Sequence, residues 1–95
     1  MFSWLFLWRR RRNIPLIVRM FTRQGCHLCE IAWRDLQDAQ ARWDFHLESV
    51  DVDGDPELVK SYGACVPVVT VNDKVRFRGV VNPVLLQRLL QQESR

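Results

Sequence analysis

The sequence contains no apolar run that is long enough to cross a membrane. A spanning helix needs roughly 18 or more apolar residues, and every apolar stretch here is shorter. Cysteine is also scarce: three in 95 residues is a small and odd number for a secreted domain that disulfides hold together. We therefore expect a single domain without a transmembrane helix, located in the reducing cytoplasm.

Basic charge is concentrated in one block, Arg9 to Arg12, and the remaining chain is nearly neutral. The residues before this block are apolar and aromatic, an order that is the reverse of a secretory signal. We expect residues 1–13 to be a leader and residues 14–95 to be the folded domain. The leader is either a loosely packed end or a weak contact with an anionic membrane surface through residues 2–12. No nucleic-acid partner is expected, because aromatic and basic residues are not interleaved elsewhere.

The rest of the chain alternates between strand and helix patterns. Helix patterns have apolar residues at spacings of three and four, whereas strand patterns are short, β-branched and bounded by turn residues. The predicted order is a strand at 16–21, a helix at 28–43, a strand at 45–53, a helix at 56–62, strands at 66–71 and 75–78, and a helix at 83–90. This βαβαββα order predicts an α/β domain with a mixed four-stranded sheet, in which the first two strands are parallel and the last two form a hairpin.

Two thiols, Cys26 and Cys29, stand where the first predicted strand leads into the first predicted helix. A helix start offers unpaired N–H groups and the positive end of the dipole, so we expect the pKa of the Cys26 thiol to be lowered. Cys29 lies one helical turn further on, near enough for a disulfide but deeper in the helix. The pattern predicts redox chemistry, with Cys26 as the attacking thiol and Cys29 as the resolving thiol. Half of a zinc site, or two inert thiols, remain alternatives.

The segment from Phe21 to Glu30, with its Gly-Cys-His-Leu-Cys motif, resembles the glutaredoxin-like family of small thioredoxin-fold proteins. Matching segments follow at 55–59, 62–63 and 66–69, so that the resemblance covers residues 15 to about 92. It implies a thioredoxin fold and a thiol-disulfide oxidoreductase that serves cell redox homeostasis or electron transport. It also implies that Pro67, after Val66, is a cis-proline beside the thiols, where the exposed preceding backbone pairs with an extended substrate.

Departures from the family pattern concern the substrate. Members that bind glutathione carry Thr-Val-Pro, where this chain has Cys65-Val66-Pro67, and they carry acidic residues after paired glycines, where residues 78–83 contain none. Arg23 stands near a family position whose basic residue pairs with a glutathione carboxylate, or it is a solvated arginine. We expect no bound cofactor, a disulfide-containing protein or small molecule as substrate, and an external thiol such as glutathione as reductant.

Two further residues beside the motif allow alternatives. Cys65 would bring a third sulfur near the pair as an alternative disulfide partner, as a metal ligand or as an inert buried residue. His27 either stabilises the Cys26 thiolate when protonated or faces solvent, and as the neighbour of Cys26 it is badly placed to share a metal ion with it. We expect no metal. The alternative functions are a metal or iron-sulfur carrier that uses Cys26, Cys29 and Cys65, or a non-catalytic binding adaptor.

Overall fold

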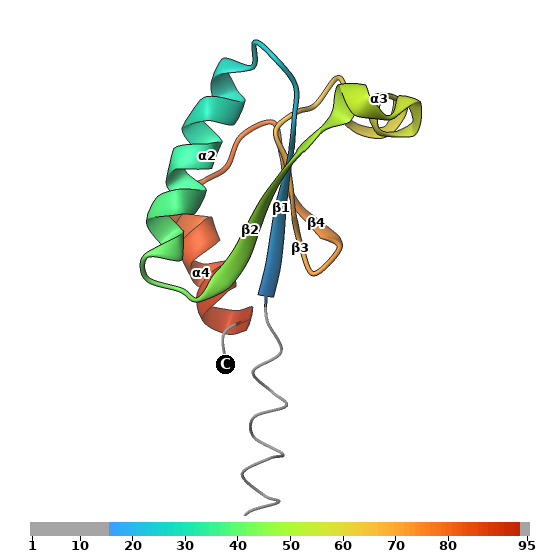
Figure 1. The fold of residues 1–95 in the computed structure, drawn as a ribbon. Helices are drawn as coiled ribbons and strands as arrows, with labels where there is room; N and C mark the ends of the chain where they lie inside the picture. Colours follow the sequence, from blue (N-terminus) through green and yellow to red (C-terminus); the bar gives the residue numbers. More distant parts are fainter. Residues whose placement is uncertain (1–15, 94–95) are drawn as a thin grey trace, which may run out of the picture.

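The computed structural model describes residues 16–93 (Figure 1). The predicted leader and its predicted membrane contact lie outside this part of the chain. The elements are β1 (Leu16–Thr22), α2 (His27–Gln40), β2 (Phe45–Asp51), the short 3-10 helix η1 (Val52–Gly54), α3 (Pro56–Tyr62), β3 (Val68–Val71), β4 (Lys74–Arg78) and α4 (Pro83–Glu93). The predicted βαβαββα order is therefore confirmed.

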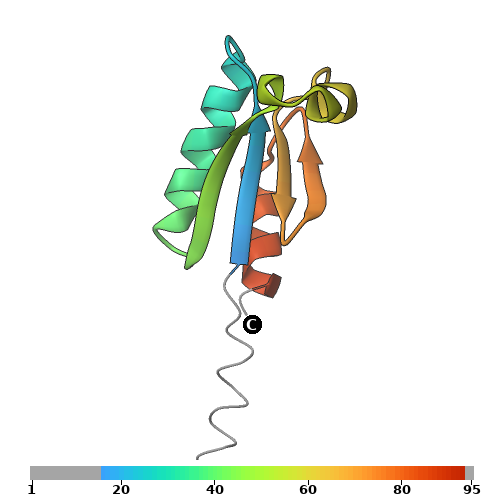
Figure 2. The ribbon, with the colours of Figure 1, turned by 45° about the vertical axis from the view of Figure 1, so that its right-hand side comes forward.

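The four strands form one mixed sheet in the order β2-β1-β3-β4. β1 and β2 are parallel, whereas β3 runs antiparallel to both β1 and β4. α2 and α4 lie on one face of the sheet, and α3 lies at the end of the sheet where β1 leads into α2 (Figures 1 and 2). Because parallel strands end at the same edge, the start of α2 and the segment that follows β2 are brought close together there.

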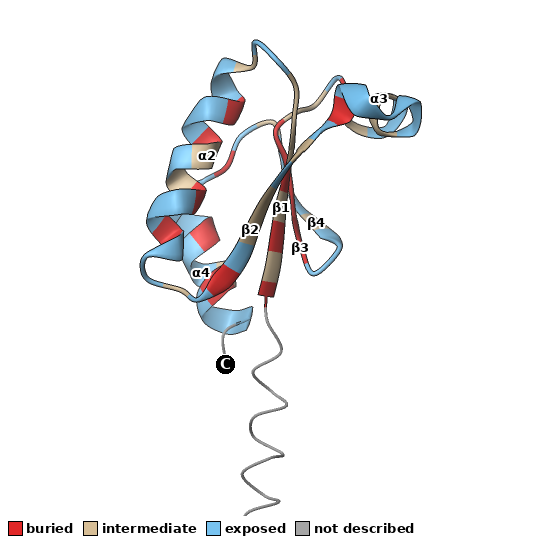
Figure 3. Ribbon diagram, viewed as in Figure 1, coloured by how far each residue is buried: buried red, intermediate tan, exposed pale blue. Residues whose placement is uncertain are grey.

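The core fills the space between the sheet and the two helices on that face (Figure 3). β1 contributes alternate residues to it, as a strand with one face on the core should. α2 contributes one apolar stripe at spacings of three and four. The core residues of these two elements are Leu16, Val18, Met20, Cys29, Ala32, Leu36 and Ala39.

Two leucines within the predicted helices do not belong to the buried apolar stripes. Leu28 is 47% exposed and Leu85 is 51% exposed, and the neighbouring Cys29 and Leu86 occupy the buried positions. One residue corresponds to a rotation of about 100° around a helix axis, so each of these leucines turns toward solvent while its neighbour continues the buried stripe. In α2, that neighbour is the second thiol, Cys29.

The second strand also ends earlier than predicted. β2 stops at Asp51, and Val52–Gly54 form η1 rather than the end of the strand. The Asp51 carboxylate accepts the N–H of Asp53 at 2.9 Å, a local bond that favours a turn over an extended strand. As a result, Asp53 lies just past the carboxyl end of β2, at the same end of the sheet as the two thiols.

Candidate functional site

The two thiols of the motif form a disulfide at the start of α2. The Cα atoms of Cys26 and Cys29 are 5.2 Å apart. Cys26 is the N-cap residue, and its Sγ accepts the backbone N–H of Cys29 at 3.1 Å. Cys29 is 3% exposed, whereas Cys26 is half-buried. One sulfur is therefore open to a partner and receives a helix-start N–H group, and the other lies in the core.

The turn before the thiols depends on a glycine. Gly25 has φ +80°, a left-handed conformation that glycine adopts without the steric cost that side chains incur. This residue reverses the chain between the end of β1 and the N-cap of α2. The positions of both sulfurs are consequently determined locally, within the residues that join the strand to the helix.

The Val66–Pro67 peptide bond is cis, which is the isomer that the family resemblance implied. Pro67 is fully buried, and Val66 and Cys26 are both partly buried against the same core. The carbonyl of Pro67 accepts the N–H of Gly79 at 2.8 Å, so the backbone next to β3 is bonded on the β4 side.

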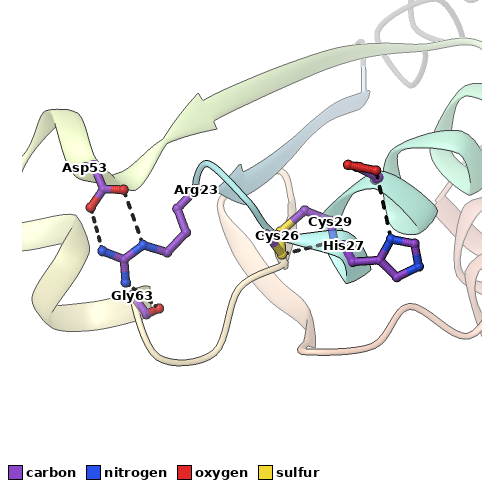
Figure 4. Close-up of a disulfide and its surroundings, with 7 residues drawn as sticks. Arg23, Cys26, His27, Cys29, Asp53 and Gly63 are labelled. Carbon is purple, nitrogen blue, oxygen red and sulfur yellow. Dashed lines mark hydrogen bonds and ion pairs between the residues drawn. A yellow bond between two sulfur atoms is a disulfide. The ribbon is translucent and has the colours of Figure 1, made fainter.

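The Arg23 side chain is 37% exposed and is bonded to two residues from other segments. Its Nε and Nη2 donate to the two carboxylate oxygens of Asp53, at 3.3 and 2.6 Å, and its Nη1 donates to the carbonyl of Gly63 at 3.0 Å (Figure 4). Hydrogen bonding to Asp53, together with the charge of that carboxylate, raises the pKa of Arg23. Asp53 and Gly63 were missed at the sequence level, since they lie 30 and 40 residues from Arg23 and no local pattern connects them.

His27 and Cys65 do not complete a metal-binding cluster with the pair. The His27 side chain is 81% exposed and points away from the disulfide, with Nδ1 4.0 Å from Oε1 of Glu30 (Figure 4). Cys65 is a free, half-buried thiol. Within residues 16–93, no three His, Cys, Asp or Glu side chains are grouped so that they could hold a metal ion. Cys65 therefore does not form a ligand set with the pair.

A hollow of about 250 Å³ opens beside the disulfide. Its lining residues are Met20, Thr22, Arg23, Gly25, Cys26, Cys29, Glu30, Trp33 and Ser49. Trp33, which lies off the apolar stripe of α2, is half-buried and lines this hollow together with a residue of β2, Ser49. The cis-proline precedes β3, on the opposite side of β1. The hollow therefore lies between the start of α2 and β2, against both sulfurs.

No helix among residues 16–93 has the length and apolar character that spanning a bilayer would require. This observation concerns the described helices alone.

Comparison with known proteins gives one family and one fold. The family model described as "Glutaredoxin-like domain (DUF836)" matches residues 17–92. A Nitrosomonas europaea protein solved by NMR is 29% identical with a TM-score of 0.71, covering 80% of this chain and 92% of its own. An X. campestris protein solved by X-ray crystallography is 31% identical with a TM-score of 0.66, covering 79% and 96%.

A thioredoxin from Halobacterium salinarum, 18% identical with a TM-score of 0.64, covers 94% of this chain and 83% of its own. At that identity, it shows the thioredoxin fold alone. A search of the curated proteins finds no match.

Proposed function

This chain belongs to the glutaredoxin-like family, and from that premise we propose that it is a thiol-disulfide oxidoreductase. The observation that carries the proposal is the disulfide between Cys26 and Cys29 at the start of α2, with the Cys29 N–H aimed at the Cys26 sulfur. A backbone N–H at a helix start stabilises a thiolate more than a thiol. The half-buried Cys26 is therefore the nucleophile, and the buried Cys29 is the resolving thiol.

The reaction follows from these two positions. In the reduced protein, the Cys26 thiolate attacks one sulfur of a substrate disulfide, forms a mixed disulfide and expels the other sulfur as a thiolate that takes up a proton. The Cys29 thiol then loses its proton and attacks the Cys26 sulfur. This second step releases the reduced substrate and leaves the Cys26–Cys29 disulfide, so two electrons have moved from the protein to the substrate. Two equivalents of an external thiol restore the dithiol.

The surroundings of the pair support a protein or a small uncharged molecule as the disulfide substrate. Arg23 is bonded to Asp53 and Gly63, and the loop at residues 78–83 contains no acid that would bind an amino group. Glutathione therefore enters as an external reductant rather than as a bound cofactor, in the reducing cytoplasm.

The Cys26 sulfur, which caps the start of α2, distinguishes this proposal from the two alternatives. A metal or iron-sulfur carrier needs a group of ligands, and the described residues offer no group of three. A non-catalytic adaptor has no need of a half-buried sulfur that receives a helix-start N–H group. Catalytic thiol-disulfide exchange, in contrast, uses both sulfurs in their observed positions, with the half-buried one attacking and the buried one resolving.

The test is the reduction potential of the pair. Purified protein is equilibrated in glutathione redox buffers, and the fraction that holds the Cys26–Cys29 disulfide is measured by mass spectrometry. We expect a two-electron midpoint between about −270 and −120 mV, unchanged in a Cys65→Ser control. We also expect a Cys29→Ser variant to accumulate a mixed disulfide at Cys26. A pair that does not oxidise across this range, or a Cys29→Ser variant that forms no mixed disulfide, would refute the proposal.

A further inference from the structure

Arg23 connects three segments that are distant in the sequence and adjacent in space. It belongs to the turn between β1 and α2, three residues before Cys26. Asp53 belongs to η1, and Gly63 follows α3 and begins the loop to the cis-proline. We call Arg23, Asp53 and Gly63 the Arg23 cluster, and Figure 4 shows it beside the disulfide.

The surroundings of Gly63 leave no room for a side chain. A Cβ atom added to Gly63 would lie 2.6 Å from the carbonyl oxygen of Val59 and 3.2 Å from Nη1 of Arg23. A side chain at this position would therefore press on the end of α3 and on the guanidinium that bonds the Gly63 carbonyl. Gly63 is itself buried, so Arg23 attaches to packed backbone and not to a loose loop.

The three bonds require the shape of an arginine side chain. A guanidinium presents several N–H groups in one plane, so it can bind a carboxylate with two of them and a carbonyl with a third. A lysine ammonium is a point charge on a flexible stem and does not reproduce this fork. A lysine at position 23 would therefore lose the bonds within the Arg23 cluster. If residue 23 only attracted a substrate carboxylate by its charge, either arginine or lysine would serve.

We infer that Arg23 is a positioning residue: it holds the loop from Gly63 to Pro67 at a set place relative to Cys26, and does not bind a substrate carboxylate. The inference rests on the proposed oxidoreductase function. A substrate disulfide must lie in line with the Cys26 sulfur while the group that it carries lies against the Val66–Pro67 segment. A displacement of about 1 Å between the two costs up to a hundredfold in rate.

The test compares four changes in the whole chain: Arg23→Lys, Arg23→Gln, Asp53→Asn and, as the matched control, Arg19→Gln. Arg19 lies on β1 and pairs with two carboxylates, those of Glu48 and Asp73. Its side chain is 31% exposed, against 37% for Arg23. It differs in lying away from the thiols. All four variants therefore change or lose an ion pair. Only the three changes in the Arg23 cluster affect the bonds that hold the loop from Gly63 to Pro67.

The first measurement is amide hydrogen exchange, which does not depend on redox activity. The N–H groups of Gly63 and Cys65 bond the carbonyls of Val59 and Tyr62 at 2.8 and 2.9 Å. We expect these two amides to exchange about tenfold faster in the three cluster variants than in Arg19→Gln. Unchanged exchange at both amides would overturn the inference, whatever the redox result.

The second measurement is the rate of mixed-disulfide formation at Cys26 in the Cys29→Ser background. The probes are glutathione disulfide, which carries carboxylates, and 2-hydroxyethyl disulfide, which is uncharged. We expect all three cluster variants to react about tenfold more slowly with both probes, with the double variant R23Q/D53N no slower than either single one, since the same loop is released.

A carboxylate-binding role for Arg23 would give a different pattern, and that pattern would overturn the inference. Arg23→Gln would slow glutathione disulfide alone, Arg23→Lys would retain the rate, and Asp53→Asn would raise it by freeing the guanidinium. If the unmodified pair reacts with neither probe, the proposed function fails, and the exchange at Gly63 and Cys65 alone decides the inference on Arg23.

Discussion

Replacement of Gly63 by alanine should lower the free energy of unfolding by about 2–4 kcal/mol. The added Cβ would lie 2.6 Å from the carbonyl oxygen of Val59, a backbone atom that also accepts the N–H of Gly63 at 2.8 Å. Relief of the overlap must move one backbone segment, at a cost of about 1–3 kcal/mol for overpacking. Loss of that hydrogen bond adds about 0.5–1.5 kcal/mol.

The assay is urea and thermal unfolding of the reduced protein, followed by circular dichroism. In a domain of this size, about 1 kcal/mol shifts Tm by about 4–8 °C, so Gly63→Ala should melt at least about 8 °C lower. The matched control is Gly54→Ala, where the added Cβ meets nothing within 4 Å and the expected change is within about 0.5 kcal/mol. Equal stabilities for the two variants would show that the close approach at Gly63 does not exist.

Three further predictions concern the thiols, one ion pair and the core. In the reduced protein, iodoacetamide should alkylate the half-buried Cys26 about tenfold or more faster than the buried Cys29, as read by peptide mass; equal rates would contradict the exposures in the structure. A hydrogen bond from Arg19 holds the pKa of Glu48 below its usual value, so Glu48→Gln should destabilise the fold at neutral pH. That difference should persist above about pH 4.5 and vanish as the pH falls through the lowered pKa, whereas a pH-independent difference in urea unfolding would exclude this ion pair as its source. Leu36 is 0% exposed, so Leu36→Ala should lower the free energy of unfolding by about 3–5 kcal/mol. A loss below about 1 kcal/mol in the same assay would contradict its place in the core.

The sequence by itself determined the features that depend on neighbouring residues. Helix and strand periods are local, so they predicted the order of the elements. The N-caps are local as well: Asp55 accepts the N–H of Glu57, and Asn82 accepts those of Val84 and Leu85. The Cys-x-x-Cys spacing placed both sulfurs at the start of a helix for the same reason, because three residues span one helical turn.

Only the tertiary structure decided which way each predicted element faces and what it meets. At the start of α2, two neighbouring apolar residues could each continue the stripe, and the fold exposed Leu28 and buried Cys29. The partners of Arg23 could not be predicted from the sequence, because the sequence gives no reason to prefer one carboxylate or backbone carbonyl over another as the acceptor. The parallel pairing of β1 with β2 brought Asp53 to Arg23, and the close approach at Gly63 supplied the third bond. Interactions across 30 and 40 residues depend on topology, which a local pattern does not contain.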